Sequence, residues 1–87
     1  IIDTVSINEL LETQLRLYPN PVEDELTVAL GATIDAISII DLNGKAVLTN
    51  SPAAPATKVD CSALAPGIYF VRVTAEGRNV VRKILVR

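Results

Sequence analysis

The chain of 87 residues contains no histidine, no tryptophan and no methionine, and only three of its residues are aromatic. It has one cysteine, Cys61, so it cannot form an internal disulfide. Histidine is the commonest general base in enzymes and a common metal ligand, and the carboxylates of this chain are dispersed over turns. Because no nucleophile–base pair and no metal cluster can be written, we expect neither an enzyme nor a cofactor-binding protein.

Other absences limit the partners and the location. The formal net charge is −2 and the basic residues are scattered except near the C-terminus, which argues against nucleic acid as a partner. The apolar runs are too short for a membrane-spanning helix, and the N-terminus lacks the basic and apolar regions of a signal peptide. Since the chain begins at Ile1 and not at methionine, we expect it to be a piece of a larger protein. Without a basic cluster around it, Cys61 is predicted to be a small buried residue in a short strand.

The residues that are abundant are Ile, Val, Leu and Ala, and they follow the alternation of β-strands. The best strand, residues 68–73, follows Pro66-Gly67. We predict a type II turn there, because proline presets φ and glycine tolerates a positive φ. Tyr69 and Phe70 point to opposite faces of this strand, which we therefore place at the centre of the core.

Further strands are predicted on both sides of this one. Residues 15–18 alternate and run into Pro19 and Pro21, which suits an edge strand that leaves the sheet. Residues 36–42 carry apolar side chains on both faces and are predicted to be central. Residues 79–86 carry charge on both faces, which is typical of an edge strand. The other predicted strands are 25–30, 46–49 and 59–61, with a loop over 50–57.

Two hairpin turns and one uncertain segment complete the prediction. Asn43-Gly44 predicts a type I′ turn, since both residues accept positive φ, and residues 76–78 predict another tight turn. Residues 1–14 contain a capping-box pattern at Ser6 and Glu9 that would start a short helix; the alternative, which we favour, is a linker. Six or seven short strands with frequent turn signals indicate an all-β fold, an antiparallel β-sandwich.

Four fragments stand in a recognisable order in this sequence. They are Leu17-Tyr18-Pro19-Asn20-Pro21, Asp41-Leu42-Asn43-Gly44-Lys45, the stretch Leu64 to Val71, and the basic terminus Val81 to Arg87. Together they resemble the type A C-terminal sorting domain of proteins exported by the type IX (Por) secretion system of Bacteroidetes. The Tyr-Pro-Asn-Pro fragment is the most specific of the four.

The resemblance implies an Ig-like sandwich over residues 15–87 that acts as a delivery signal, with residues 1–14 as the linker to an N-terminal cargo domain. The implied partners are the outer-membrane type IX translocon and a sortase-like cysteine peptidase, which would cleave within residues 1–16. The cargo would pass the periplasm and the outer membrane and be secreted or held at the cell surface. The implied sorting-motif residues are Tyr18, Pro19, Asn20, Pro21, Gly44, Lys45, Gly67, Tyr69, Arg82, Lys83 and Arg87.

Two other functions stay open. The stretch around Tyr69 also resembles a tyrosine corner, in which a tyrosine hydroxyl bonds to upstream backbone, so a generic Ig- or fibronectin-like spacer or adhesion module is the main alternative. Carbohydrate binding is disfavoured because two of the three aromatic side chains are needed by the central strand. For the sorting hypothesis, we expect Arg82, Lys83 and Arg87 to lie along one exposed edge whose backbone groups are free for strand addition or charge pairing.

Overall fold

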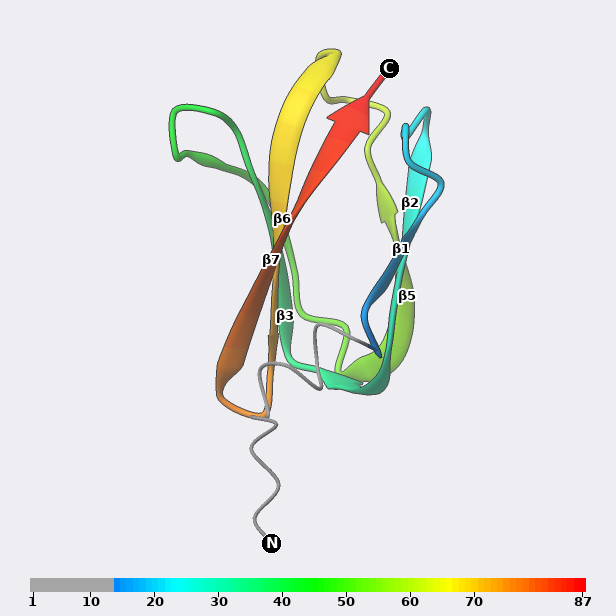
Figure 1. Ribbon diagram of the computed structural model, residues 1–87, viewed down its shortest axis with the longest axis vertical. Coiled ribbons are helices and arrows are strands. Elements are labelled where there is room, and N and C mark those ends of the chain that lie inside the picture. Colours follow the sequence, from blue (N-terminus) through cyan, green and yellow to red (C-terminus); the bar gives the residue numbers. More distant parts are fainter. Residues whose placement is uncertain (1–13) are drawn as a thin grey trace, which may run out of the picture.

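The computed structural model describes residues 14–87, and in it the chain forms two antiparallel β-sheets that pack face to face (Figure 1). The three-stranded sheet has the order β1-β2-β5, and the four-stranded sheet has the order β4-β3-β6-β7. The all-β sandwich predicted from the sequence is confirmed. The helix or linker expected at the N-terminus falls on residues 1–13, which lie outside the described residues. The strands are β1 (Arg16–Tyr18), β2 (Glu25–Ile34), β3 (Ala36–Ile40), β4 (Ala46–Asn50), β5 (Ala54–Asp60), β6 (Gly67–Ala75) and β7 (Arg78–Val86).

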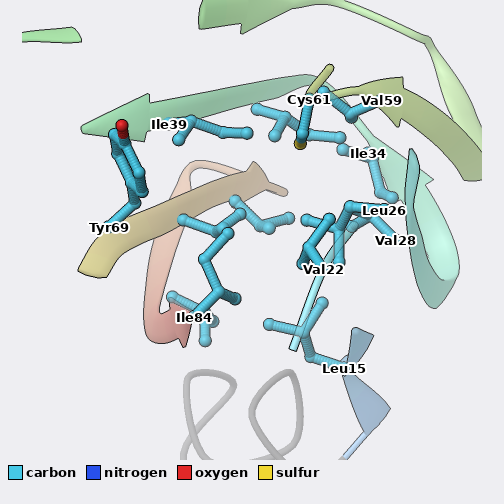
Figure 2. Packing of buried hydrophobic residues seen from close by; sticks show 14 of the residues in the cluster. Leu15, Val22, Leu26, Val28, Ile34, Ile39, Val59, Cys61, Tyr69 and Ile84 are labelled. Atoms are coloured by element: carbon cyan, nitrogen blue, oxygen red, sulfur yellow. The ribbon is translucent and has the colours of Figure 1, made fainter. Parts of the chain in front are cut away.

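The core lies between the sheets and is made by alternate residues of the strands (Figure 2). Val28 of β2 and Ile39, Val71 and Ile84 of the other sheet are all buried members of this core. Tyr69 is also buried, with 8% of its surface exposed. Cys61, directly after β5, is fully buried and packs as a small hydrophobic residue, as expected.

The outer face of the four-stranded sheet corrects two predictions. Phe70 lies on this face, half-buried, so only one aromatic residue of β6 contributes to the core. β3 is interior in its sheet but is buried on one face only: it ends at Ile40, which is half-buried opposite Phe70, and Leu42 is 68% exposed. A sandwich of two sheets covers one face of each, so apolar residues on the second face stay at the surface.

Two strands are longer than predicted, because hydrogen-bond pairing and not side-chain packing determines where they begin or end. β5 begins at Ala54, within the stretch predicted to be a loop, because its small residues pair with β2, with Ala56 opposite Ala29. β2 continues past Gly31, which has a φ of +82° and sits where the β2–β5 register shifts. β1 and β7 are edge strands of their sheets, as predicted.

The type I′ turn predicted at Asn43-Gly44 was wrong, whereas the tight turn predicted over residues 76–78 is present. The type I′ turn occurs at Glu76-Gly77, where both residues have positive φ, +54° and +74°. In the β3–β4 hairpin only Gly44 has positive φ, +86°, and its N–H donates to the carbonyl oxygen of Asp41 at 3.0 Å. Leu42 and Asn43 therefore occupy the centre of that turn, which matches a three-residue hairpin loop with glycine in the left-handed region.

The turn before β6 also differs from the prediction. Gly67 has a φ of +153°, far from the value of about +80° that a type II turn needs, and it opens β6 opposite Val86. The chain reverses earlier, where Leu64 N–H donates to the carbonyl oxygen of Cys61 at 3.0 Å. Pro66 lies in a bend that leads into β6.

Candidate functional site

The Tyr-Pro-Asn-Pro fragment forms the exit from the edge strand β1. Tyr18 is the last residue of β1 and is 51% exposed; Pro19 and Asn20 are exposed and Pro21 is half-buried. Both proline peptide bonds, Tyr18-Pro19 and Asn20-Pro21, are cis. The fragment leads directly into Val22, which is fully buried and anchors the exit to the core.

This exit is fastened to the C-terminal end of β7 by three hydrogen bonds. The N–H of Leu85 donates to Oδ1 of Asn20 at 3.1 Å, and the N–H of Val22 donates to the carbonyl oxygen of Leu85 at 2.7 Å. The N–H of Arg87 donates to the carbonyl oxygen of Val22 at 2.8 Å, and Val22 forms a parallel bridge with Val86. We call this contact between residues 20–22 and 85–87 the terminal clip. It joins the first and last family fragments, 65 positions apart at Asn20 and Leu85.

All four fragments of the resemblance gather at one end of the sandwich (Figure 1). The register places the end of β3, Ile40, opposite Phe70 near the start of β6, and the start of β6, Gly67, opposite Val86 at the end of β7. The terminal clip adds Val22 to the same end. We call this the motif end, formed by residues 18–22, 41–45, 64–69 and 83–87. β1 begins toward the opposite end, so the described chain enters the domain away from the motif end.

The Asp41–Lys45 fragment is held by its own carboxylate. Oδ1 of Asp41 accepts hydrogen bonds from the N–H of Asn43 at 2.9 Å and from the N–H of Lys45 at 3.0 Å. The N–H of Asp41 in turn donates to the carbonyl oxygen of Lys45 at 2.9 Å. Asp41 and Gly44 therefore have a structural role in shaping this loop, and the exposed side chain of Lys45 is presented on it.

The Leu64–Val71 fragment contains a tyrosine corner. The hydroxyl of Tyr69 donates to the carbonyl oxygen of Ala65 at 2.6 Å, while its ring is buried in the core. The bond fixes the segment before β6 onto the body of the sandwich. The hydroxyl interaction expected from the sequence is confirmed.

The three basic residues near the terminus do not form one row, contrary to the prediction. Arg82 lies on the core-facing side of β7, between the buried Val80 and Ile84; it is half-buried and already has an interaction. Lys83 is exposed on the outer face, and Arg87 is exposed just beyond β7. Successive residues of a strand point to opposite faces, so Arg82 and Lys83 cannot act on one surface.

The edge of β7 is also less open than predicted, because Leu85 and Arg87 are bonded in the terminal clip. Next to the clip lies a surface recess of about 250 Å³, lined by Asn20, Ile68, Lys83, Ile84 and Leu85. Ile68 and Leu85, opposite each other in the register, are 40% and 42% exposed at its rim. The motif end thus combines an apolar recess with a cationic side chain.

The comparisons with known proteins agree with this geometry. The family model described as the secretion system C-terminal sorting domain matches residues 16–87. The chain belongs to this family. The type IX secretion resemblance noted in the sequence is therefore confirmed, and members of this family mark proteins for export to the cell surface or the extracellular space.

A solved structure supports the fold of the sorting domain. PorZ from Porphyromonas gingivalis, described as an essential bacterial surface component of the type IX secretion system, is similar with a TM-score of 0.74 and 21% sequence identity. The similarity covers 94% of this chain and 12% of the PorZ chain, so this sorting domain spans only a small part of that protein's length. No curated protein matches the chain.

The remaining chemistry of the sorting domain is sparse. Burial raises the pKa of the Cys61 thiol, and the neighbouring Asp60 carboxylate raises it further. Hydrogen bonds from Ser62, first its side chain and then its N–H, lower the pKa of Asp60. Within residues 14–87, no group of three or more Cys, Asp and Glu side chains is placed to hold a metal ion, and no helix is long and apolar enough to cross a membrane.

Sequence reasoning missed the partners of the motif residues. Val22 and Leu85 contribute backbone groups to the terminal clip, and Ala65 contributes its carbonyl oxygen to the tyrosine corner. Backbone groups carry no sequence signal. The carboxylate of Asp41 was recoverable, since aspartate two residues before a turn amide is a familiar turn-forming arrangement.

Proposed function

We propose that residues 15–87 form the delivery signal of a larger precursor, that the outer-membrane type IX translocon recognises its motif end, and that a sortase-like cysteine peptidase then removes it. The cut would fall within residues 1–16, before the Tyr18–Pro21 fragment. The cargo would precede these residues and reach the medium or the cell surface.

The observation that carries this proposal is the position of the motif end. Four fragments spread over the sequence meet at one end of the sandwich, and β1 enters from the other. A cargo attached through the linker would therefore sit away from the motif end. Tyr18, Lys83 and Arg87 are exposed there, so a receptor could bind them without unfolding the domain.

The test is an export assay with a reporter protein. A signal peptide, the reporter and Leu15–Arg87 are joined, and the reporter is followed in cells with a working type IX system and in cells without the translocon. We expect it in the medium or at the surface in the first and in the periplasm in the second. Equal export from both strains would exclude a sorting function.

Matched charge variants locate the recognised surface. Replacing Lys83 and Arg87 by glutamine should retain the reporter in the periplasm, because both cations lie at the motif end. Replacing Arg78 by glutamine should leave export unchanged, since this exposed cation lies beside the Glu76-Gly77 turn, at the end of β7 opposite to the motif end. Melting temperatures close to that of the parent domain are required in each case, so that loss of export cannot be attributed to unfolding.

A spacer or adhesion module is the second candidate function, and the tyrosine corner at Tyr69 favours it, because Ig-like domains of many functions share this feature. A spacer has no need of the translocon. It would leave export unchanged by every substitution at the motif end, and the same assay separates the two functions.

A further inference from the structure

The four-stranded sheet differs from its partner in charge. Its strands β3, β4, β6 and β7 contain no acidic residue, whereas β2 and β5 of the other sheet contain Glu25 and Asp60. The formal net charge of −2 belongs to the whole chain, whose residues 1–14 include three acidic side chains and no basic one; residues 15–87 hold eight basic and seven acidic side chains, so the strands of this sheet carry a local excess of cations. Of its cations within strands, Arg72 and Lys83 lie on the outer face, whereas Arg78 and Arg82 lie on the other side of β7.

Within the described residues, the β7 edge of this sheet carries unpaired backbone groups. Leu85 directs its N–H and carbonyl oxygen away from β6 and into the terminal clip. In an antiparallel ladder every second residue of an edge strand does the same, so Asn79, Val81 and Lys83 also direct theirs away from β6. Within residues 14–87 no backbone hydrogen bond is made to these three residues across that edge. The terminal clip shows that the edge accepts a peptide: Val22 is already bonded there in parallel orientation.

The outer face beside this edge has a defined pattern. Val81 is 53% exposed and lies opposite Arg72, and Lys83 is exposed and lies opposite Phe70. Leu85 and Ile68 continue the apolar surface to the recess beside the clip. A strand added along β7 would meet an apolar side chain at Val81 and a cation at Lys83 on the same face.

We infer that residues 79–83 of β7 bind an extended segment of a partner protein by strand addition, and that this segment is acidic with apolar side chains interspersed. The inference rests on the proposed function, and it specifies the kind of partner segment that would bind along β7 beside the motif end. Main-chain hydrogen bonds give such a contact its affinity, and the side chains on the covered face give its specificity. A second copy of the chain is a poor occupant, because pairing β7 with itself would bring two cationic strands together.

The probe is a heptapeptide with blocked termini and the sequence Thr-Glu-Thr-Val-Thr-Glu-Thr. Its matched control has lysine in place of glutamate. Each is titrated into the 15N-labelled 87-residue chain, up to about millimolar peptide, where weak strand addition is measurable. We expect the glutamate peptide to shift the amide signals of Asn79, Val81 and Lys83 and to slow their hydrogen exchange. The lysine peptide should bind at least about tenfold more weakly, because it places like charges beside Lys83.

Two sets of variants test the backbone and the charge separately. Val81→Pro removes an N–H that the β6–β7 ladder does not use, so the domain should keep its fold and lose the peptide; Val81→Thr keeps that N–H and should bind as the parent does. Arg72→Glu combined with Lys83→Glu should reverse the preference, so that the lysine peptide binds more tightly than the glutamate peptide. If Val81→Pro does not fold, the reversed peptide preference of the double glutamate variant is the deciding test.

Several results would overturn the inference. Equal binding of both peptides, or shifts confined to residues outside 79–85, would contradict strand addition with acidic specificity. Binding of phosphatidylglycerol vesicles or of RNA in place of the glutamate peptide would make the sheet a surface for a different class of partner. If Val81→Pro abolishes peptide binding but the reporter is exported at the parental level, strand addition is not the mode of recognition, while the sorting function itself stands. Translocon-independent export of the parent refutes the sorting function instead.

Discussion

Asn20→Ala is the sharpest probe of the terminal clip, because Asn20 is the one side chain in it. The change removes the acceptor of the 3.1 Å bond from Leu85 N–H and leaves the two backbone bonds of Val22 in place. One hydrogen bond of this kind stabilises a fold by about 0.5–1.5 kcal/mol. The Leu85 amide should therefore exchange with solvent about twofold to tenfold faster, and the free energy of unfolding should fall by no more than about 1.5 kcal/mol.

Hydrogen exchange followed by NMR measures the local effect, and urea unfolding measures the global one. Asn20→Asp keeps a carboxyl oxygen as acceptor and should preserve the protection of Leu85. Asn43→Ala is the matched control, because the side chain of Asn43 is exposed and makes no hydrogen bond within residues 14–87. Unchanged exchange at Leu85 in Asn20→Ala would refute the clip. Loss of several kcal/mol would show that Asn20 supports far more than one bond.

Three further predictions concern the fold. Tyr69→Phe should lower the free energy of unfolding by about 0.5–1.5 kcal/mol, because the hydrogen bond to Ala65 is lost. Tyr69→Ala should lower it by about 3–5 kcal/mol, more than Phe70→Ala does. Equal losses for the two alanine variants would contradict the placement of Tyr69 and Phe70 on opposite faces of β6. Gly77→Val should cost about 1–3 kcal/mol in urea unfolding because φ is +74°, and a neutral result would exclude that turn. Iodoacetamide should alkylate native Cys61 far more slowly than the urea-unfolded chain. Because burial raises the pKa of this thiol in the folded state, the thiol's contribution to the free energy of unfolding should be present below about pH 8.5 and lost as the pH rises above that value. A free energy of unfolding that rises above about pH 8.5 would contradict the burial of Cys61.

The strands were predictable from the sequence because alternation is a local signal. Val28 sits in a run whose period is two, and this period predicts which face of β2 is buried. The strands of Ile39 and Ile84 carry apolar residues on both faces, so only the packing of the two sheets decides which face is buried there. The beginning of β5 was not predictable in this way. Ala54 and Ala56 have no apolar contrast with their neighbours, and they form a strand because β2 offers hydrogen-bond partners.

The turn at Asn43-Gly44 was located correctly but was given the wrong type, for a physical reason. Asn-Gly allows a type I′ turn, but the carboxylate of Asp41 accepts two turn amides and stabilises a longer loop with only Gly44 at positive φ. The type I′ turn forms instead at Glu76-Gly77, where the ladder continues to Ala75 and Arg78 and leaves room for two residues only. Turn type is thus set by the hydrogen bonds of the flanking strands as much as by the turn residues.

In the candidate site, too, some features could be predicted from the sequence and others are given only by the fold. The sequence names Asn20 as a motif residue, but its partner is a backbone amide 65 positions away, and no pattern in the side chains points to that contact. The charges of Arg82 and Lys83 are visible in the sequence, but only the strand assignment separates them onto two faces. A motif read from sequence therefore gives the residues and leaves their partners to the fold.

The structural roles of motif residues bear on which of them a receptor can read. Asn20, Gly44 and Tyr69 each have a role within the domain: Asn20 fastens the terminal clip, Gly44 supplies the positive φ of a hairpin, and Tyr69 closes the corner. Selection for folding alone would maintain all three. Tyr18 and Lys83 are different, because they are exposed at the motif end and their side chains form no hydrogen bond or ion pair within residues 14–87. An exposed side chain without an internal role is free to serve recognition, so the contact surface of the sorting signal should be sought around these two residues and along the β7 edge that begins beside them.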